Sequence, residues 1–300
     1  MADTNIVLDD KFSKELRWYY KSLDSHISPA SRKLLEEYSH IPAVDVDSHI
    51  YKMRDILWSQ APYPCIGEFK FLTLNLPKHP LYTQVLTLLR ETPHTKLLDL
   101  GCAVAQELRS LTHAGIPSSN LYGSDLNSSY LTTSYALFND AETFKGTLFP
   151  ADIFSPELFT KEFKGWEGMF RVIHAGLFLH LFSWEQQIEV CSRIIKMLSP
   201  EKGSIFLGEM VGCQGSNGHA RGRGAKFWKV GTQEMKNFLH DEVTFPKMWE
   251  EVAEKMGTVG GWKVESKLKV RGEDVRAEKE KTSFFAGEGI GWFTFSVERV

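Results

Sequence analysis

The 300-residue sequence predicts an α/β fold in which a mostly parallel sheet follows a helical extension. From residue 96 onward, short apolar runs alternate with segments of helix length, which is typical of βαβ units. Before that point the sequence favours helices, with apolar residues near helical spacing. We therefore predict an N-terminal helical cap at residues 1–92 and a Rossmann-like domain with the sheet at residues 93–300.

Four helices are predicted in the cap. The first covers residues 12–23 and is rich in aromatic side chains. The second begins after Ser28, a favourable N-cap, has Pro29 in its first turn and runs to Tyr38. The third covers residues 47–58 and ends before two prolines, and the fourth, at residues 80–90, leads into the sheet domain.

Seven strands are predicted after the cap. Five of them are short apolar runs, at residues 96–100, 121–124, 147–151, 170–175 and 204–210. Two more lie in the tail, at residues 262–270 and 291–300. The run of mixed charges at residues 271–281 favours a solvated loop that joins the last two strands into a hairpin.

Composition excludes several classes of protein. With 35 basic against 38 acidic residues and a net charge of -3, the chain lacks the basic excess of nucleic-acid-binding proteins. Its four cysteines form no CxxC pair, so we expect no structural zinc and no metal. The sequence shows no secretion signal and no apolar run near the roughly 20 residues that cross a bilayer. We expect a soluble, cytoplasmic protein.

A glycine turn after the first predicted strand carries the strongest functional signal. Residues 97–105 read LLDLGCAVA, and a helix follows. Gly101 lets the backbone approach a nucleotide-like ligand, and the helix offers free N–H groups. Asp125 ends the next strand and can accept both hydroxyls of a ribose, whereas Asp152 follows the third strand and can accept from an adenine amino group. Each aspartate alone could equally be a helix N-cap; together they indicate one ligand crevice.

The turn distinguishes between two adenosine cofactors. A nicotinamide dinucleotide has a pyrophosphate, and its usual GxGxxG turn is absent here. S-adenosylmethionine has no phosphate, so its turn needs fewer glycines. Asp99, two residues before Gly101, also suits the amino-acid end of that donor better than a phosphate.

The order of these motifs resembles that of class I S-adenosylmethionine-dependent methyltransferases: LLDLGCAVA, LYGSDL, ADIF, RVIHAGLFLHLFSW and MLSPEKGSIFLGEMVG. More narrowly, the chain is similar to fungal O-methyltransferases of meroterpenoid and polyketide pathways, which esterify acids or methylate oxygens of secondary metabolites. PYPCIGEF at residues 62–69, KHPLY at 78–82 and FLHDE at 238–242 carry this likeness. It implies a seven-stranded sheet whose last strand is antiparallel, with S-adenosylmethionine as donor and S-adenosylhomocysteine as product.

The resemblance also implies roles for particular residues. Those expected at the cofactor are Tyr63, Asp99, Gly101, Cys102, Asp125, Leu126, Asp152, Ile153 and His174. Those expected at the substrate are Phe178, Trp184, Arg221 and Arg223, with His180 as the catalytic residue. One departure from the class pattern is that Ala103 and Ala105 stand where glycines are common, which restricts positive φ and puts cofactor affinity in doubt.

The chemistry depends on the acceptor. A carboxylate is ionised at neutral pH and needs no general base, whereas a phenol or an alcohol would benefit from one. His180 follows the fourth strand and is interpreted as that base, as a substrate ligand, or as a packing residue. The cationic, glycine-rich segment at residues 212–229 is either a lid that holds an acidic substrate or a solvated loop.

Our main hypothesis is methyl esterification of a small polyketide- or terpenoid-derived acid, with the helical cap shielding the donor. Phenol or hydroxyl methylation and a non-catalytic partner subunit that binds the donor remain alternatives. A nicotinamide oxidoreductase is disfavoured because a Tyr-x-x-x-Lys pair is also missing. Amino-group methylation of DNA or protein is weakened because AGLF at residues 175–178 replaces an Asn/Asp-Pro-Pro-Tyr motif. The sequence leaves the oligomeric state open, a homodimer included.

Overall fold

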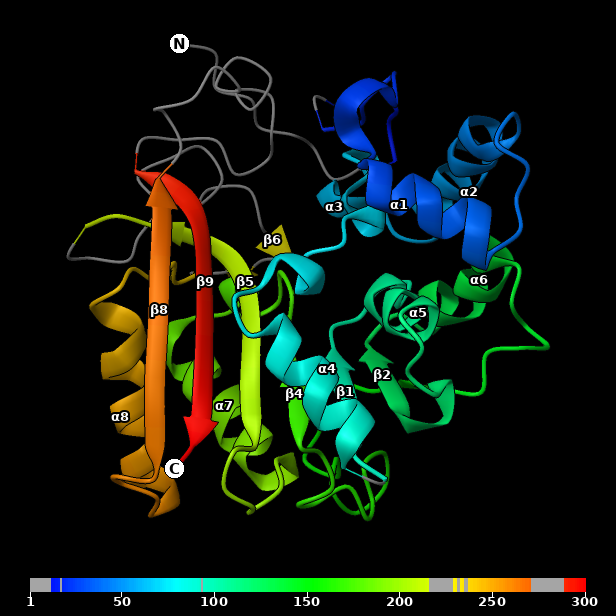
Figure 1. Cartoon of the computed structure of the whole chain (residues 1–300). Coiled ribbons are helices and arrows are strands. Elements are labelled where there is room, and N and C mark those ends of the chain that lie inside the picture. The colour runs from blue at the N-terminus through cyan, green and yellow to red at the C-terminus, as the bar shows by residue number, and fades with distance from the viewer. Residues whose placement is uncertain are drawn as a thin grey trace, which may run out of the picture.

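A computed structural model describes residues 12–16, 18–92, 94–215, 229–230, 233–234, 237–270 and 289–300. Its main feature is a seven-stranded sheet with the strand order β3-β2-β1-β4-β5-β9-β8 (Figure 1). The strands are β1 (Leu97–Leu100), β2 (Leu121–Asp125), β3 (Thr147–Pro150), β4 (Val172–His174), β5 (Ile205–Cys213), β8 (Trp262–Val270) and β9 (Ile290–Arg299). These seven strands coincide with the seven predicted ones to within a few residues at each end.

The strand directions match the predicted fold class. β1 through β5 pair in parallel, whereas β9 runs antiparallel to both β5 and β8. The last strand of the chain is therefore the reversed one, as expected. A further two-stranded pairing, β6 (Lys229–Val230) with β7 (Gln233–Glu234), begins at the last residue of the segment 212–229 predicted as a lid or a solvated loop.

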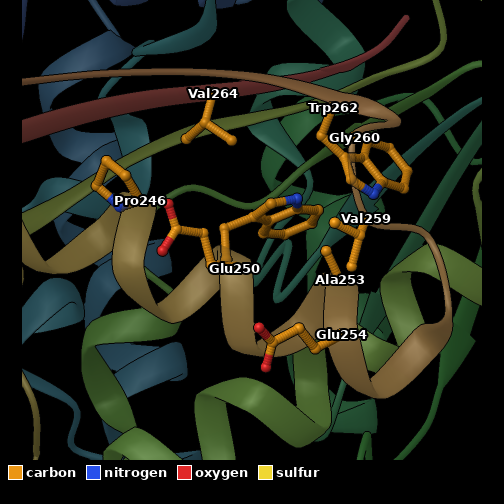
Figure 2. A pocket seen from close by; sticks show the side chains of 9 residues that line it. Pro246, Glu250, Ala253, Glu254, Val259, Gly260, Trp262 and Val264 are labelled. Atoms are coloured by element: carbon orange, nitrogen blue, oxygen red, sulfur yellow. The ribbon is translucent and has the colours of Figure 1, made fainter.

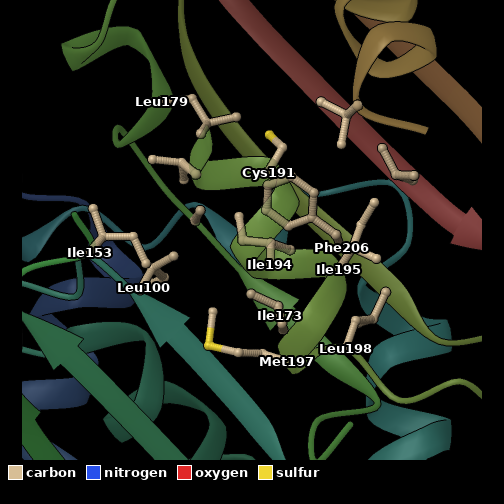
Figure 3. Packing of buried hydrophobic residues seen from close by; sticks show 14 of the residues in the cluster. Leu100, Ile153, Ile173, Leu179, Cys191, Ile194, Ile195, Met197, Leu198 and Phe206 are labelled. Atoms are coloured by element: carbon tan, nitrogen blue, oxygen red, sulfur yellow. The ribbon is translucent and has the colours of Figure 1, made fainter. Parts of the chain in front are cut away.

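Helices cover both faces of the sheet. Along β1 the side chains alternate, so that Leu98 and Leu100 belong to one buried cluster and Leu97 to another. The first cluster packs against α7 (Trp184–Met197) and α8 (Thr244–Met256), and Figure 3 shows its centre around Ile173 and Phe206. The second packs against α4 (Tyr82–Glu91) and α5 (Gln106–His113). The central strands β1, β4 and β5 are buried on both faces, as parallel sheets require, whereas β3 and β8 at the two edges are only partly buried.

The N-terminal segment contains short helices that lie beside α5 and α6 (Ser128–Phe138) in Figure 1. They are η2 (Asp24–His26), α1 (Pro29–Lys33), η3 (Leu34–Tyr38), α2 (Val46–Gln60), α3 (Pro64–Gly67), η4 (Lys70–Leu72) and η5 (Leu76–Lys78). Ser28 caps α1 through its hydroxyl, which accepts from the Ser31 N–H, as predicted. The predictions of helices at residues 47–58 and 80–90 are confirmed by α2 and α4.

The predicted helix at residues 12–23 is wrong. The described part of this stretch forms turns, and some of its polar groups bond to other segments. The Tyr20 N–H donates to the carbonyl of Gly67, and the Tyr19 hydroxyl donates to Asp55 of α2. Trp18 and Tyr19 are both buried against α2. Anchoring these large aromatic rings outweighs local helix propensity.

The N-terminal segment shares a hydrophobic core with the sheet domain. Residues of α2, α3 and η4 cluster with Val104, Tyr130 and Phe138. A buried ion pair adjoins this core: Arg109 of α5 binds Asp140 through Nε at 2.9 Å, and the Tyr38 hydroxyl donates to the same carboxylate at 2.7 Å. The predicted boundary at residue 92 thus crosses a continuous packed interface, and the division into two domains stays a prediction.

A surface hollow lies at the far edge of the sheet, between α8 and β8 (Figure 2). Trp249 and Trp262 form part of its wall, and Glu250 and Glu254 lie at its rim. None of the residues predicted to bind a ligand lines it. Across the described residues, no helix is both long and apolar enough to span a membrane.

Candidate functional site

Three strand ends form one edge of the sheet and hold the predicted acidic residues. Asp99 of β1 is in register with His174 of β4. Asp125 of β2 is in register with Pro150, which ends β3 two residues before Asp152. Because these strands are parallel, their carboxyl ends and the loops that follow share one edge, where ligands of open α/β sheets bind. The structure thus brings Asp99, Asp125 and Asp152 to one edge; their ligand contacts stay a prediction.

The turn after β1 is held against β2. The N–H groups of Gly101 and Cys102 both donate to the carbonyl of Ser124, at 2.8 and 3.1 Å. Gly101 has a φ of 73°, and a Cβ there would overlap the ring of Phe178. Glycine is therefore needed twice, for the left-handed backbone and for the close approach of that ring. The ring of Phe178 therefore packs directly on the backbone of this turn.

Two alanines in this turn adopt the conformation that glycine prefers. Ala103 has a φ of 48° and Ala105 a φ of 54°, both in the left-handed region. A residue with a Cβ pays about 1–2 kcal/mol there. The sequence departure noted above therefore leaves the shape of the turn intact and adds strain to it. Ala105 precedes the first residue of α5, so the helix begins directly at the turn.

Asp125 is fixed by two backbone donors. Its Oδ2 accepts from the Ala103 N–H at 2.8 Å, and its Oδ1 accepts from the Asn127 N–H at 2.9 Å. Burial raises the pKa of Asp125, and these two N–H bonds oppose the rise only in part. Each carboxylate oxygen has a second lone pair. The side chain is thus oriented and can still accept two ligand hydroxyls.

The PYPCIGEF segment lies beside this carboxylate. Tyr63, which precedes α3, packs edge-on against Tyr130 of α6 with ring centroids 6.2 Å apart. Burial raises the pKa of Tyr63, and the charge of Asp125 adds to the rise. The structure therefore brings Tyr63 and Asp125 together although they are far apart in sequence. Leu126, the next residue, is 68% exposed at the same edge.

The other cofactor candidates differ in what they offer a ligand. Asp152 is exposed, and its Oδ1 accepts from the Phe154 N–H at 2.9 Å, which is a local turn contact. Ile153 is buried in the core. Cys102 is buried as well, and burial raises the pKa of its thiol well above the usual range. Only the backbone of Cys102 is therefore suited to ligand contact.

Asp99 and His174 form a buried pair across β1 and β4. The Nδ1 of His174 lies 2.7 Å from Oδ1 of Asp99, and its Nε2 lies 3.6 Å from Glu209 of β5. Burial alone lowers the pKa of His174, but the carboxylates of Asp99 and Glu209 outweigh it and raise that pKa well above its usual value. His174 is therefore a buried imidazolium between two carboxylates.

Two acidic residues near this pair were missed in the sequence analysis. Glu209 is a charged residue within the otherwise apolar strand β5. Glu107 lies in the first turn of α5, where it accepts from the N–H groups of Asn75 and Leu76. Burial raises the pKa of Glu107 to about 8. The signal for Glu209 was present, since a carboxylate within a strand buried on both faces calls for an explanation.

His180 lies in η7 (Leu179–Leu181), directly after β4, and is buried. Burial, and then the charge of Lys70, lower the pKa of His180 to about 3. Lys70 in turn forms an ion pair with the buried carboxylate of Glu68 in the PYPCIGEF segment. The imidazole is therefore neutral at physiological pH, and it suits a hydrogen bond to a substrate better than removal of a proton.

The predicted substrate residues separate in the structure. The ring of Phe178 covers Gly101 and packs edge-on against Phe182, with centroids 5.1 Å apart. Trp184 instead donates its indole N–H to Glu251 of α8 and packs against Phe238, so its described contacts hold α7 to α8. Arg221 and Arg223, with most of the predicted lid, lie outside the described residues.

The residues at this edge fit an adenosine ligand with an amino-acid end. Gly101 leaves the turn without a Cβ, and Asp125 keeps oriented acceptors beside Tyr63. The buried Oε1 of Glu209 and Nε2 of His174 have no hydrogen-bond partner among the described residues. Within the same residues, no cluster of three or more His, Cys, Asp or Glu side chains could hold a metal ion.

Comparison with known sequences agrees with this geometry. Residues 18–72 match the family described as the meroterpenoid methyltransferase N-terminal domain. The chain is 40% identical to O-methyltransferase phiE of Fungal sp. (strain ATCC 74256), over 82% of this chain and 78% of that protein. It is 38% identical to O-methyltransferase atr3 of Stereocaulon alpinum, over 86% and 70%. It is 33% identical to Asnovolin E/Chermesin D methyltransferase nvfJ of Aspergillus novofumigatus, over 77% and 79%.

Solved structures share the fold at low sequence identity. Phosphoethanolamine N-methyltransferase 2 of Haemonchus contortus, in complex with phosphomonomethylethanolamine and S-adenosylhomocysteine, superposes with a TM-score of 0.51 at 16% identity. The match covers 82% of this chain and 60% of that one. At this identity the likeness concerns the fold alone. The predicted Rossmann-like sheet of a class I methyltransferase, with its reversed last strand, is confirmed.

Proposed function

Because the chain belongs to the family of fungal secondary-metabolite methyltransferases, we propose that it methylates a carboxylate oxygen of a small polyketide- or terpenoid-derived acid. S-Adenosylmethionine supplies a methyl group on a sulfonium sulfur; transfer forms an O–CH3 bond, breaks the S–CH3 bond, and leaves a methyl ester and S-adenosylhomocysteine. No metal takes part in this scheme.

The observation that carries the proposal is the neutral, buried imidazole of His180. A base whose conjugate acid has a pKa of about 3 is far too weak to deprotonate a phenol, with its pKa near 10. A carboxylate arrives already ionised and only has to be placed in line with the methyl group. The proposed role of His180 is therefore to donate an N–H bond to the acceptor acid.

The remaining roles are assigned from position. Asp125, held by Ala103 and Asn127, accepts the ribose hydroxyls, and Asp152 accepts from the adenine amino group. Asp99 faces the amino-acid end of the donor, through its pair with His174. Phe178 covers the turn and excludes water from the reacting atoms.

Binding comes first in the experimental test. Calorimetry should detect binding of S-adenosylmethionine and of S-adenosylhomocysteine but no binding of NADH. Aromatic and terpenoid acids should then be offered beside phenols of the same skeleton, with the products identified by mass spectrometry. Alkaline hydrolysis separates the outcomes, because hydroxide cleaves a methyl ester and leaves an aryl methyl ether intact. Methylation of the phenols alone would refute the carboxylate proposal.

A variant pair separates a hydrogen-bond donor from a base. In His180→Gln an amide N–H replaces the imidazole, so we expect kcat to fall less than about tenfold; loss of a general base would cost about 100-fold to 10,000-fold. His240→Gln is the matched control, since burial likewise lowers the pKa of His240 to about 3, while its ring contacts Gln187 and Thr244. A general-base-sized loss in His180→Gln alone would favour hydroxyl methylation.

A further inference from the structure

Four titratable side chains from four elements converge beneath the loops after β1 and β4. They are Asp99 of β1, Glu107 of α5, His174 of β4 and Glu209 of β5. His174 contacts both Asp99 and Glu209, at 2.7 and 3.6 Å. Glu107 is close enough that the charges of the other three change its pKa. All four are buried, so their charges act in a medium that screens them far less than water does.

This cluster carries a net negative charge. Asp99 and Glu209 flank a single imidazolium, His174. Glu107, with a pKa raised by burial to about 8, holds its proton at neutral pH and adds no charge. His79 also faces the cluster, but burial lowers its pKa and its ring bonds to the Phe295 carbonyl and the Leu81 N–H. Two negative charges therefore face one positive charge.

The Glu209 carboxylate lies against Gly176, in the loop after β4. It is 8% exposed, and its Oε1 has no hydrogen-bond partner among the described residues. That oxygen lies 2.7 Å from the position that a Cβ on Gly176 would occupy, so a larger residue there would force the Glu209 carboxylate to move. Gly176 begins the loop that carries Phe178 and His180 to the site. The unpaired oxygen therefore lies directly under the loop where donor and acceptor are proposed to meet.

S-Adenosylmethionine and its product differ in charge. The donor has a sulfonium and an ammonium against one carboxylate, so it is a net cation, whereas S-adenosylhomocysteine is neutral overall. A buried negative charge near the crevice favours the former over the latter. Buried carboxylates without full hydrogen bonding are costly to the fold, which argues for a functional reason to keep them.

We propose that Glu209 is a specificity-determining residue whose uncompensated negative charge selects the cationic donor over its neutral product. Methyl transfer removes the positive charge on sulfur, so the reaction itself weakens the attraction and promotes product release. This inference rests on the proposed function, because it assumes that the crevice binds this donor.

Binding measurements on the full chain test it without turnover. Calorimetry at pH 6.5 gives dissociation constants for S-adenosylmethionine, S-adenosylhomocysteine and sinefungin, a stable cationic analogue. In Glu209→Gln, which keeps the shape and removes the charge, both cations should lose roughly tenfold in affinity relative to the neutral product. Glu201→Gln removes one charge at the opposite sheet edge, before β5, and should leave the affinity ratio unchanged.

A second variant should change the affinity ratio in the opposite direction, and it keeps the proposal testable if the first variant misfolds. His174→Gln removes the positive charge, so the ratio should shift further toward the cationic ligands; circular dichroism confirms that each variant is folded. Unchanged ratios in folded Glu209→Gln and His174→Gln would overturn the inference while leaving the proposed function standing. If the unmodified chain bound neither sulfur ligand, the proposed function and this inference would both fall.

Discussion

The left-handed conformation of Ala103 should cost the protein stability that glycine would restore. Its φ is 48°, a region that costs a residue with a Cβ about 1–2 kcal/mol. Ala103→Gly removes this strain, but it also gives the unfolded chain about 0.4–1 kcal/mol of extra entropy. The half-buried methyl group contributes less than about 0.8 kcal/mol. These terms nearly cancel, so we expect a variant equal to or slightly more stable than the parent.

A matched substitution isolates the strain. Ala114 is half-buried like Ala103, and it is the C-cap residue directly after α5, with an ordinary φ of -76°. In Ala114→Gly the entropy and burial losses are similar and no strain is relieved. We therefore expect Ala103→Gly to be more stable than Ala114→Gly by about 1–2 kcal/mol. For a chain of this size the difference corresponds to roughly 2–3 °C in Tm.

Urea denaturation followed by tryptophan fluorescence measures the two variants against the parent chain. The midpoint should differ between the variants with a common m value, which shows that stability and not the denatured state has changed. Equal losses of unfolding free energy in Ala103→Gly and Ala114→Gly would refute the reasoning, because the turn would then carry no strain at position 103.

Three further outcomes follow from the site and its supports. Asp125→Ala should lower the affinity for S-adenosylmethionine about 100-fold, because two charge-assisted hydrogen bonds are lost, while the free energy of unfolding falls by far less. An unchanged Kd by calorimetry rules out the ribose role. Asp140→Ala leaves the buried guanidinium of Arg109 unpaired and should cost about 3–5 kcal/mol in urea unfolding, with a loss under 1 kcal/mol counting against the ion pair. Burial raises the pKa of Glu107 from 4.5 to about 8, so the folded state holds that proton longer than the unfolded state, and stability falls as pH rises through this window. Glu107→Gln should gain stability relative to the parent between pH 5 and 8, and parallel stability profiles would contradict this.

The sequence predicted the sheet well because its signals are local. Runs such as residues 97–100 are apolar, short and bounded by turns, so strand type and order follow from the chain itself. The turn at Gly101 and the acidic residue Asp125 were found for the same reason, since each follows directly on a strand.

What the sequence could not predict depends on contacts between distant segments. Residues 12–23 have helical composition, but Trp18 and Tyr19 are anchored on α2, and this tertiary contact decides their conformation. Glu107 and Glu209 acquire meaning only when α5 and β5 place them beside His174. The altered basicity of His180 likewise comes from burial and from Lys70, which is remote in sequence.

The shared core between the N-terminal segment and the sheet domain limits how these proteins can be recombined. A chimera joined at residue 92 would take Tyr38 from one parent and Asp140 from another, and it would split the apolar cluster around Tyr130. If the N-terminal helices are exchanged to change the substrate preference, the facing surfaces of α5 and α6 must therefore be exchanged together with them. A chimera should therefore exchange both sides of this packed interface and not residues 1–92 alone.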